Sequence, residues 1–207
     1  MSTVMTMKQK QGAESREKIL DAAVGLIFER GYSGTTISAL CKRSGLLVSS
    51  VYHHFGSKDG VLAAVVKRES ERFFTELPRW DDFPGEDVVL RFRSFMEAVG
   101  SAIHEDPKFF RILVTLSMEP ADISDETIDS IRRVREGGRH YLDESISAMV
   151  EAVHSSHDPV EISSFCLAVL EGSAIGRRIE PGVLVHDLVF RQLATAAIAL
   201  ASAPEDD

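Results

Sequence analysis

The chain has 207 residues, 44% apolar and 27% charged, a balance that excludes wholesale disorder and allows one large domain or two small ones. Its two cysteines, Cys41 and Cys166, lie far apart without partners at metal-ligand spacing, so we expect no disulfide framework, no metal and a reduced, cytoplasmic protein. The net charge of −9 hides an asymmetry, because residues 1–72 hold 11 Lys/Arg against 7 Asp/Glu and residues 73–207 hold 12 against 25.

Apolar residues recur at three- and four-residue spacing nearly throughout, and strict alternation is absent, so we predict an all-α fold. Residues 1–12 are predicted to be a disordered arm, and the N-terminus lacks the continuous apolar core of a signal peptide. Ser15 can cap a first helix that ends before Gly31. No stretch reaches the ~20 uninterrupted apolar residues that span a bilayer, so we expect no membrane partner.

Three further helices are predicted, two short ones over residues 37–43 and 48–55 and a long one over residues 58–74. Thr35 or Thr36 can cap the first of these helices, Gly45 ends it, and Ser57 can cap the last. Two short helices joined across a glycine form the helix-turn-helix pattern. Residues 13–60 are therefore predicted to be a helix-turn-helix domain.

The third helix has neither a broad apolar face nor a charged one. Val51 is expected to pack inward, and His54 and Phe55 are interpreted as core, which leaves an outward face of Val48, Ser49, Tyr52 and His53. Short side chains allow a helix to lie deep in the major groove, where hydroxyls reach base edges and a valine methyl touches a thymine methyl. This face therefore predicts DNA contact.

Two overlapping segments, REKILDAAVGLIFERGY and GYSGTTISALCKRSGLLVSSVYHHFGSKDGV, resemble the DNA-binding head of the tetracycline-repressor (TetR) family of bacterial transcriptional regulators. The resemblance covers about residues 15–62 and implies DNA contacts by Thr36, Val48, Ser49, Ser50, Tyr52, His53 and Lys58. Thr36 and Lys58 stand at helix starts, where free N–H groups and a partial positive charge favour phosphate.

Leu47 departs from the family pattern, because members usually carry Ser or a similar cap there. Losing a cap costs about 0.5–2 kcal/mol, so either a neighbour caps the helix or the helix starts elsewhere. The recognition helix also carries no Arg or Lys for a guanine contact. Phosphate contacts and DNA shape are expected to supply much of the affinity, and further positive charge comes from Lys8, Lys10, Arg16, Lys18, Lys42 and Arg43.

The remainder, residues 61–203, is predicted to be a ligand-binding and dimerisation domain. After a break in LPRWDDFPGED, helices are predicted over residues 86–105, 107–118, 125–154, 159–178 and 183–201, and residues 203–207 are expected to be disordered. The pair Gly137-Gly138 interrupts the longest of these helices and predicts a kink or a close approach.

Aromatic and methionine side chains concentrate between residues 73 and 118. Such residues at helical spacing are more often core than a binding site, and the cavity expected here is implied by the resemblance. Its predicted lining is Phe73, Phe92, Phe95, Met96, His104, Phe110, Leu113 and His140.

The last two predicted helices are apolar and rich in small residues, which let helices approach closely. Two copies would form a four-helix dimer interface, for which we name Phe165, Ala168, Val169, Gly172, Gly176, Leu193 and Ala197. A symmetric dimer would place two recognition helices about 34–36 Å apart, which matches one turn of DNA.

We accordingly expect a homodimeric, ligand-responsive transcriptional regulator of repressor type that binds a palindromic operator and is released by a small apolar or amphipathic effector. No catalytic constellation, phosphate loop or cofactor motif is visible, so we expect neither an enzyme nor a cofactor. The alternative is a helical enzyme or carrier that uses the cavity of residues 61–203 for a small apolar molecule. Whether the regulator represses or activates does not follow from these residues.

Overall fold

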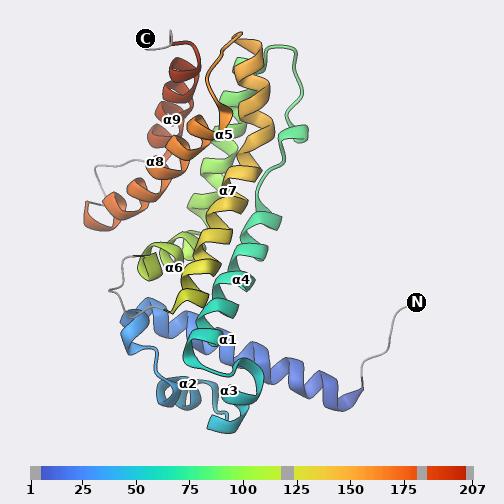
Figure 1. Cartoon of the computed structure of the whole chain (residues 1–207), viewed down its shortest axis with the longest axis vertical. Helices are drawn as coiled ribbons and strands as arrows, with labels where there is room; N and C mark the ends of the chain where they lie inside the picture. Colours follow the sequence, from blue (N-terminus) through green and yellow to red (C-terminus); the bar gives the residue numbers. More distant parts are fainter. Residues whose placement is uncertain (1–5, 118–123, 181–185, 204–207) are drawn as a thin grey trace. The chain divides into compact units, whose positions relative to one another are not determined.

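The computed structural model describes residues 6–117, 124–180 and 186–203 (Figure 1). Regular structure in this part of the chain is helical and includes no strand, which confirms the predicted all-α fold. The helices are α1 (Met7–Gly34), α2 (Ile37–Ser44), α3 (Val48–Phe55), α4 (Lys58–Glu76), η1 (Trp80–Asp82), α5 (Val88–Glu105), α6 (Lys108–Ser117), α7 (Asp125–Ala152), α8 (Pro159–Ile179) and α9 (His186–Ala201). The predicted disorder of residues 1–5 and 204–207 concerns segments outside the described residues.

The chain divides into two compact units. The first unit comprises the described parts of residues 1–70 and 111–132, and the second comprises those of residues 71–110 and 133–207. All three boundaries fall inside helices, so α4, α6 and α7 each supply residues to both units. The first unit thus extends beyond the predicted helix-turn-helix domain of residues 13–60.

Helix α1 begins earlier than predicted. Thr6 caps it, and the Thr6 and Gln9 side chains bond each other's backbone N–H groups in a capping box. Ser15 lies inside the helix and donates to the Gln11 carbonyl at 2.8 Å, so its predicted capping role is wrong. Residues 7–12 are likewise helical and not disordered. This segment was predicted to be disordered because it is polar, but the Thr6 cap starts a helix there. At Gly31, where the first helix was predicted to end, the backbone kinks with φ 67°.

The core of the first unit is built on a stripe of α1. Ile19, Leu20 and Ala23 are fully buried there, and Leu40 of α2 and Val51 of α3 are buried as well. Because these residues recur at helical spacing, their burial fixes which face each helix turns outward. Helix α1 contacts both α2 and α3, which lie side by side in Figure 1.

The turns between these helices follow the predicted chemistry. Gly45 ends α2 in the left-handed region at φ 71°, which favours glycine. Ser57 Oγ accepts a hydrogen bond from the Gly60 N–H at 2.9 Å and so caps α4. A Cβ atom at Gly60 would lie only 2.1 Å from the Phe55 carbonyl oxygen, so this position requires glycine. These turns fix where α3 stands between α2 and α4.

In the second unit α5 and α8 both pack against α9. The ends of α5, α7 and α8 agree with the prediction to within about two residues, and the predicted helical residues 118 and 183–185 lie outside the described part of the chain. Phe92, Phe95 and Met96 on the inner face of α5 are fully buried. The glycine pair of α7 marks the close approach that was one of its two predicted roles, because a Cβ at Gly138 would lie 3.1 Å from Leu167 Cδ2.

Candidate nucleic-acid interface

Helix α3 presents the outward face that the sequence predicts. Val48 and Tyr52 are 49% and 51% exposed, and Ser49 and His53 are exposed too. Ser50 is half-buried, while Val51 on the opposite face is fully buried. The eight-residue helix is therefore anchored by one face and leaves short polar and apolar side chains free to meet a partner.

The entrance to α3 is made by Leu47. The helix begins at Val48, and Leu47 occupies the N-cap position, where its alkyl side chain offers no hydrogen-bond acceptor. The expectation of another cap or another start is therefore wrong, because the helix starts at its predicted residue without a side-chain cap. The Ser50 N–H instead donates to the Leu47 carbonyl at 3.0 Å. The Leu47 side chain is 75% exposed, so a large apolar group stands beside Val48 at the start of the helix.

Two helix starts flank this face with predicted phosphate contacts. The exposed Thr36 side chain accepts a hydrogen bond from the Ala39 N–H at 3.1 Å, and its hydroxyl hydrogen can still be donated. Lys58 Nζ lies 3.5 Å from the centroid of the Tyr32 ring, and Tyr32 Oη donates to Asp59 Oδ1 at 2.8 Å. Lys58 is thus held near the start of α4 by a cation–π contact.

The other cations of the first unit differ in how they are held. Arg43 pairs with Glu29 at 2.7 Å, and the Arg16 guanidinium lies 5.3 Å from the Phe55 ring centroid. Lys8, Lys10, Lys18 and Lys42 are exposed. Burial, with repulsion from His53 and Arg16, lowers the pKa of His54, which favours a neutral imidazole in its half-buried position.

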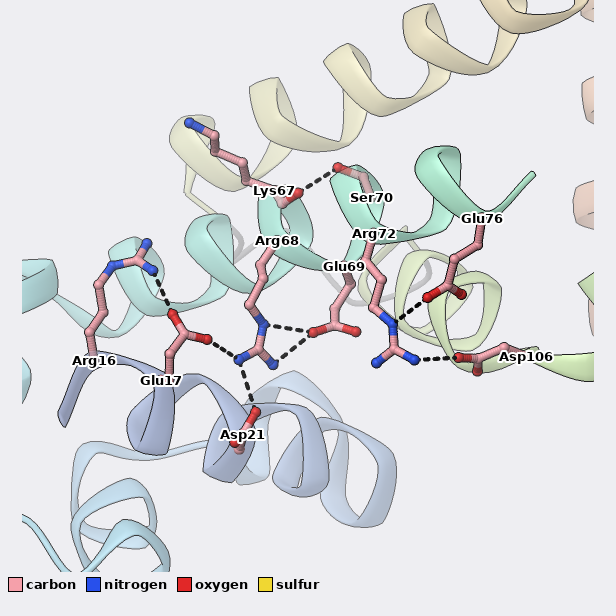
Figure 2. Close-up of polar contacts among 10 residues, drawn as sticks. All are labelled: Arg16, Glu17, Asp21, Lys67, Arg68, Glu69, Ser70, Arg72, Glu76 and Asp106. Carbon is pink, nitrogen blue, oxygen red and sulfur yellow. Dashed lines mark hydrogen bonds and ion pairs between the residues drawn. The ribbon is translucent and has the colours of Figure 1, made fainter. Parts of the chain in front are cut away.

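Arg68 on α4 forms an ion network with α1 (Figure 2). Its Nη1 atom lies 2.8 Å from Glu17 Oε2 and 2.9 Å from Asp21 Oδ1, and its Nε donates to Glu69 Oε1 at 2.8 Å. Burial disfavours the charge, but the bonds to these carboxylates outweigh it and raise the pKa of Arg68. The network ties α4 to α1 within the first unit. Sequence analysis missed it, because Arg68 is 47 and 51 residues from its α1 partners.

The predicted effector residues of the second unit belong to a packed aromatic cluster. Phe73 stacks on Phe109 with centroids 4.7 Å apart, and Phe95 contacts Tyr141 at 5.7 Å and Trp80 at 5.5 Å. The Tyr141 hydroxyl donates to the Pro78 carbonyl at 2.5 Å, and burial raises its pKa. Phe92, Phe95, Met96 and Phe110 are buried and Phe73 is half-buried, while Leu113, buried as well, belongs to the first unit.

Two predicted cavity residues lie elsewhere. His104 is exposed, and the His140 side chain is 90% exposed with Nδ1 3.5 Å from Asp143 Oδ2, so neither lines the aromatic interior and both predictions are corrected. Polar residues at helical spacing face outward here, which the sequence pattern alone did not resolve. A hollow of about 250 Å³ between α5 and α9 is lined by Glu97, Gly100, Ser101, Phe190 and Arg191, none of which was predicted.

The predicted dimer residues also fall into two groups. Phe165, Ala168 and Gly172 are exposed on α8, and Val169 and Gly176 are half-buried. Leu193 and Ala197, by contrast, are 2% and 0% exposed. Their predicted place in the dimer interface is wrong, because they belong to the core of the protomer. Small apolar residues at helical spacing look the same in sequence whether they pack on their own chain or on a partner.

Two further features bear on the class of protein. The stretch Pro159–Gly176 in α8 is long and apolar enough to cross a membrane by its length and composition, and 33% of it is buried within the protein. Across the described residues no group of three or more His, Cys, Asp or Glu side chains could hold a metal ion.

Comparison with known proteins identifies the helix-turn-helix region. The family model for bacterial regulatory proteins of the tetR family matches residues 19–65. The transcriptional repressor KstR of Rhodococcus jostii is 30% identical over 94 residues, which are 45% of this chain and 43% of KstR, less than half of that protein. The negative regulator IcaR of the Staphylococcus epidermidis icaADBC biofilm operon is 25% identical over 150 residues, 72% of each chain.

A solved structure shares the fold over nearly the whole length. A TetR-like transcriptional regulator from Rhodococcus sp. RHA1 superposes with a TM-score of 0.67 at 21% identity, over 92% of this chain and 97% of the other. The agreement therefore extends past the matched head into the helices of the second unit. The helix-turn-helix region of this chain, residues 19–65, is therefore that of the tetR family of bacterial regulatory proteins.

Proposed function

We propose that this protein is a cytoplasmic DNA-binding transcriptional regulator that binds a palindromic operator as a homodimer and leaves it when a small apolar or amphipathic effector binds. The observation that carries the proposal is the outward face of α3, where Val48, Ser49, Tyr52 and His53 are exposed above a fully buried Val51. The match of residues 19–65 to the tetR family model supports the DNA-binding role. The repressors KstR and IcaR favour repression over activation.

Recognition would combine base contacts from α3 with phosphate contacts from its surroundings. Thr36 and Lys58 are placed at helix starts, where a phosphate meets N–H groups as well as the side chain. Lys58 would exchange its cation–π contact with Tyr32, worth about 0.5–1 kcal/mol at an exposed site, for a phosphate. Phosphate contacts fix the register on the duplex, and the α3 side chains would read sequence.

The proposal is tested by titrating the purified chain against duplex DNA from the region beside its own gene, at several salt concentrations. A regulator should bind one duplex specifically. If it makes about 6–10 phosphate contacts, raising the salt concentration from about 50 to 200 mM should weaken its affinity about 10³–10⁵-fold. If no duplex binds specifically, the proposal fails and the alternative of a helical carrier or enzyme gains ground.

Variants separate reading from positioning. Tyr52→Ala should strongly weaken specific binding without unfolding the protein, because the side chain is half exposed. Lys58→Ala should weaken binding to all duplexes and reduce the salt slope by about one. As a matched control, Lys67→Ala changes an exposed lysine of the same helix that is two turns past its start. Parent-like affinity in both test variants would contradict these roles.

The dimer would form through the large exposed apolar residues of α8 and α9, which are Val160, Phe165, Ile179, Leu188 and Leu200. Two such helices from each protomer would bury these side chains in a four-helix interface. Phe165→Glu should convert a dimer into a monomer in sedimentation velocity. Leu90→Glu, which alters an exposed leucine on α5, should leave the dimer intact. A parent protein that sediments as a monomer would refute the dimer.

The effector site is proposed within the aromatic cluster of the second unit. Trp80, the single tryptophan, is buried there against Phe95, so its fluorescence reports on the cluster. An effector at about 100 times its Kd should stabilise the fold by about 2.7 kcal/mol, shift the Trp80 emission and release bound DNA. An effector that releases DNA without changing Trp80 emission would place its site elsewhere.

A further inference from the structure

We infer that α3 reads its operator through the 5-methyl groups of thymine, with Leu47 as a specificity-determining residue. This inference deepens the proposed function and rests on it. Leu47, Val48 and Tyr52 are the three large apolar side chains that the helix-turn-helix exposes, at 75%, 49% and 51%. All three belong to α3 or to its N-cap, and Val48 and Tyr52 lie four positions apart on one helix face, so we call the three residues the apolar strip of α3.

The composition of α3 decides what this strip can recognise. Its sequence, VSSVYHHF, carries no Arg or Lys, so the bidentate contact that selects guanine is not available from it. Alkyl side chains distinguish bases in the major groove by touching the thymine methyl, because the other three bases present no alkyl group there. Ser49 beside Leu47 and Val48 is short, which allows a close approach to the base edges.

Leu47 is placed where base contact is expected. The N-terminal residues of a recognition helix contact base edges in helix-turn-helix proteins. A serine at this N-cap position would accept a backbone hydrogen bond and favour the helix, whereas leucine offers no acceptor and leaves its side chain in water. The leucine side chain therefore makes no capping bond that stabilises the fold. Its surroundings favour DNA as a partner, because Thr36 and Lys58 stand at the starts of α2 and α4.

The test uses duplexes selected from a random-sequence library by the purified full-length protein. Each thymine of a selected duplex is replaced in turn by deoxyuridine, which removes only the 5-methyl group, and affinities are measured by fluorescence anisotropy. Because a buried methyl-sized group contributes about 0.8 kcal/mol, affinity should fall about fourfold for each contacted methyl. Thymines outside the stretch of duplex that the protein covers serve as controls, and their replacement should leave the affinity unchanged.

Leu47→Ser assigns the contact to one residue. This variant restores a capping side chain, so it should fold at least as well as the parent in thermal unfolding. We call the loss of affinity caused by replacing a thymine with deoxyuridine the uracil penalty. In Leu47→Ser this penalty should disappear at one thymine of each half-site and remain at the others. Val48→Ser provides the matched comparison and should lose the penalty at a different thymine.

The outcomes separate the two levels of the proposal. If the library yields no specific duplex, the proposed DNA-binding function itself fails. If specific duplexes bind equally well with uracil in place of every thymine, the methyl readout is wrong while the proposed function stands. If the uracil penalties are unchanged in Leu47→Ser, Leu47 is not the specificity-determining residue.

Discussion

The recognition helix of the first unit and the aromatic cluster of the second use large apolar side chains in opposite ways. Leu47 and Tyr52 leave half or more of their surface in water, whereas Phe92 and Phe95 are fully buried. Exposed apolar groups add little to folding but are available to a partner, and buried groups do the reverse. Large apolar side chains are therefore left available to a partner in one unit and stabilise the fold in the other.

Phe95→Ala should destabilise the protein more than any other substitution proposed for the two units. The ring is fully buried and contacts Trp80, Phe83 and Tyr141, so its removal leaves a cavity and should cost about 3–5 kcal/mol. Urea denaturation measures the loss. Tyr52→Ala, the counterpart in the first unit, should change the free energy of unfolding by no more than about 0.5 kcal/mol. Equal losses in the two variants would erase the contrast.

Arg68→Ala should have an intermediate effect. It removes the partner of Glu17 and Asp21 and leaves the Glu69 side chain, 10% exposed, without its arginine, which should cost about 1–3 kcal/mol in urea denaturation. Arg72→Ala is the matched variant on the same helix, because its side chain is 56% exposed and pairs with Glu76. That change should cost about 0–1 kcal/mol. A loss as small for Arg68 would show that its network does not hold α4 to α1.

The sequence predicted most of the fold, because apolar residues at helical spacing indicate the buried face of a helix and capping residues indicate its ends. Gly45 and Ser57 act as the predicted stop and cap. The start of α1 was wrong because the Thr6 capping box precedes a polar run whose helical character no apolar stripe reveals. Helix propensity and capping in residues 6–12 outweighed the absence of an apolar periodicity.

The candidate site was predictable only where a local pattern defines it. The outward residues of α3 follow from eight consecutive positions around the buried Val51. Exposed His140 and buried Leu193, in contrast, were assigned to the wrong surroundings, because helical spacing alone does not say which face meets another helix. The Arg68 network depends on tertiary contact over about fifty residues, for which a single sequence carries no signal.

The smallest expected effect concerns the two cysteines, because each unit contains one and labelling them does not require a change in stability. Cys166 in the second unit is fully buried, and burial raises the pKa of its thiol from 9.0 to about 12, whereas Cys41 on α2 is half exposed. Because the thiolate is the nucleophile, Cys166 should stay protonated and unreactive toward a thiol reagent between about pH 7 and pH 9. One thiol should therefore react in the native protein, none in Cys41→Ser, and both in urea. Rapid labelling of Cys166 in the native Cys41→Ser variant would mean that the second unit opens locally, and its aromatic cluster could then admit an effector without unfolding.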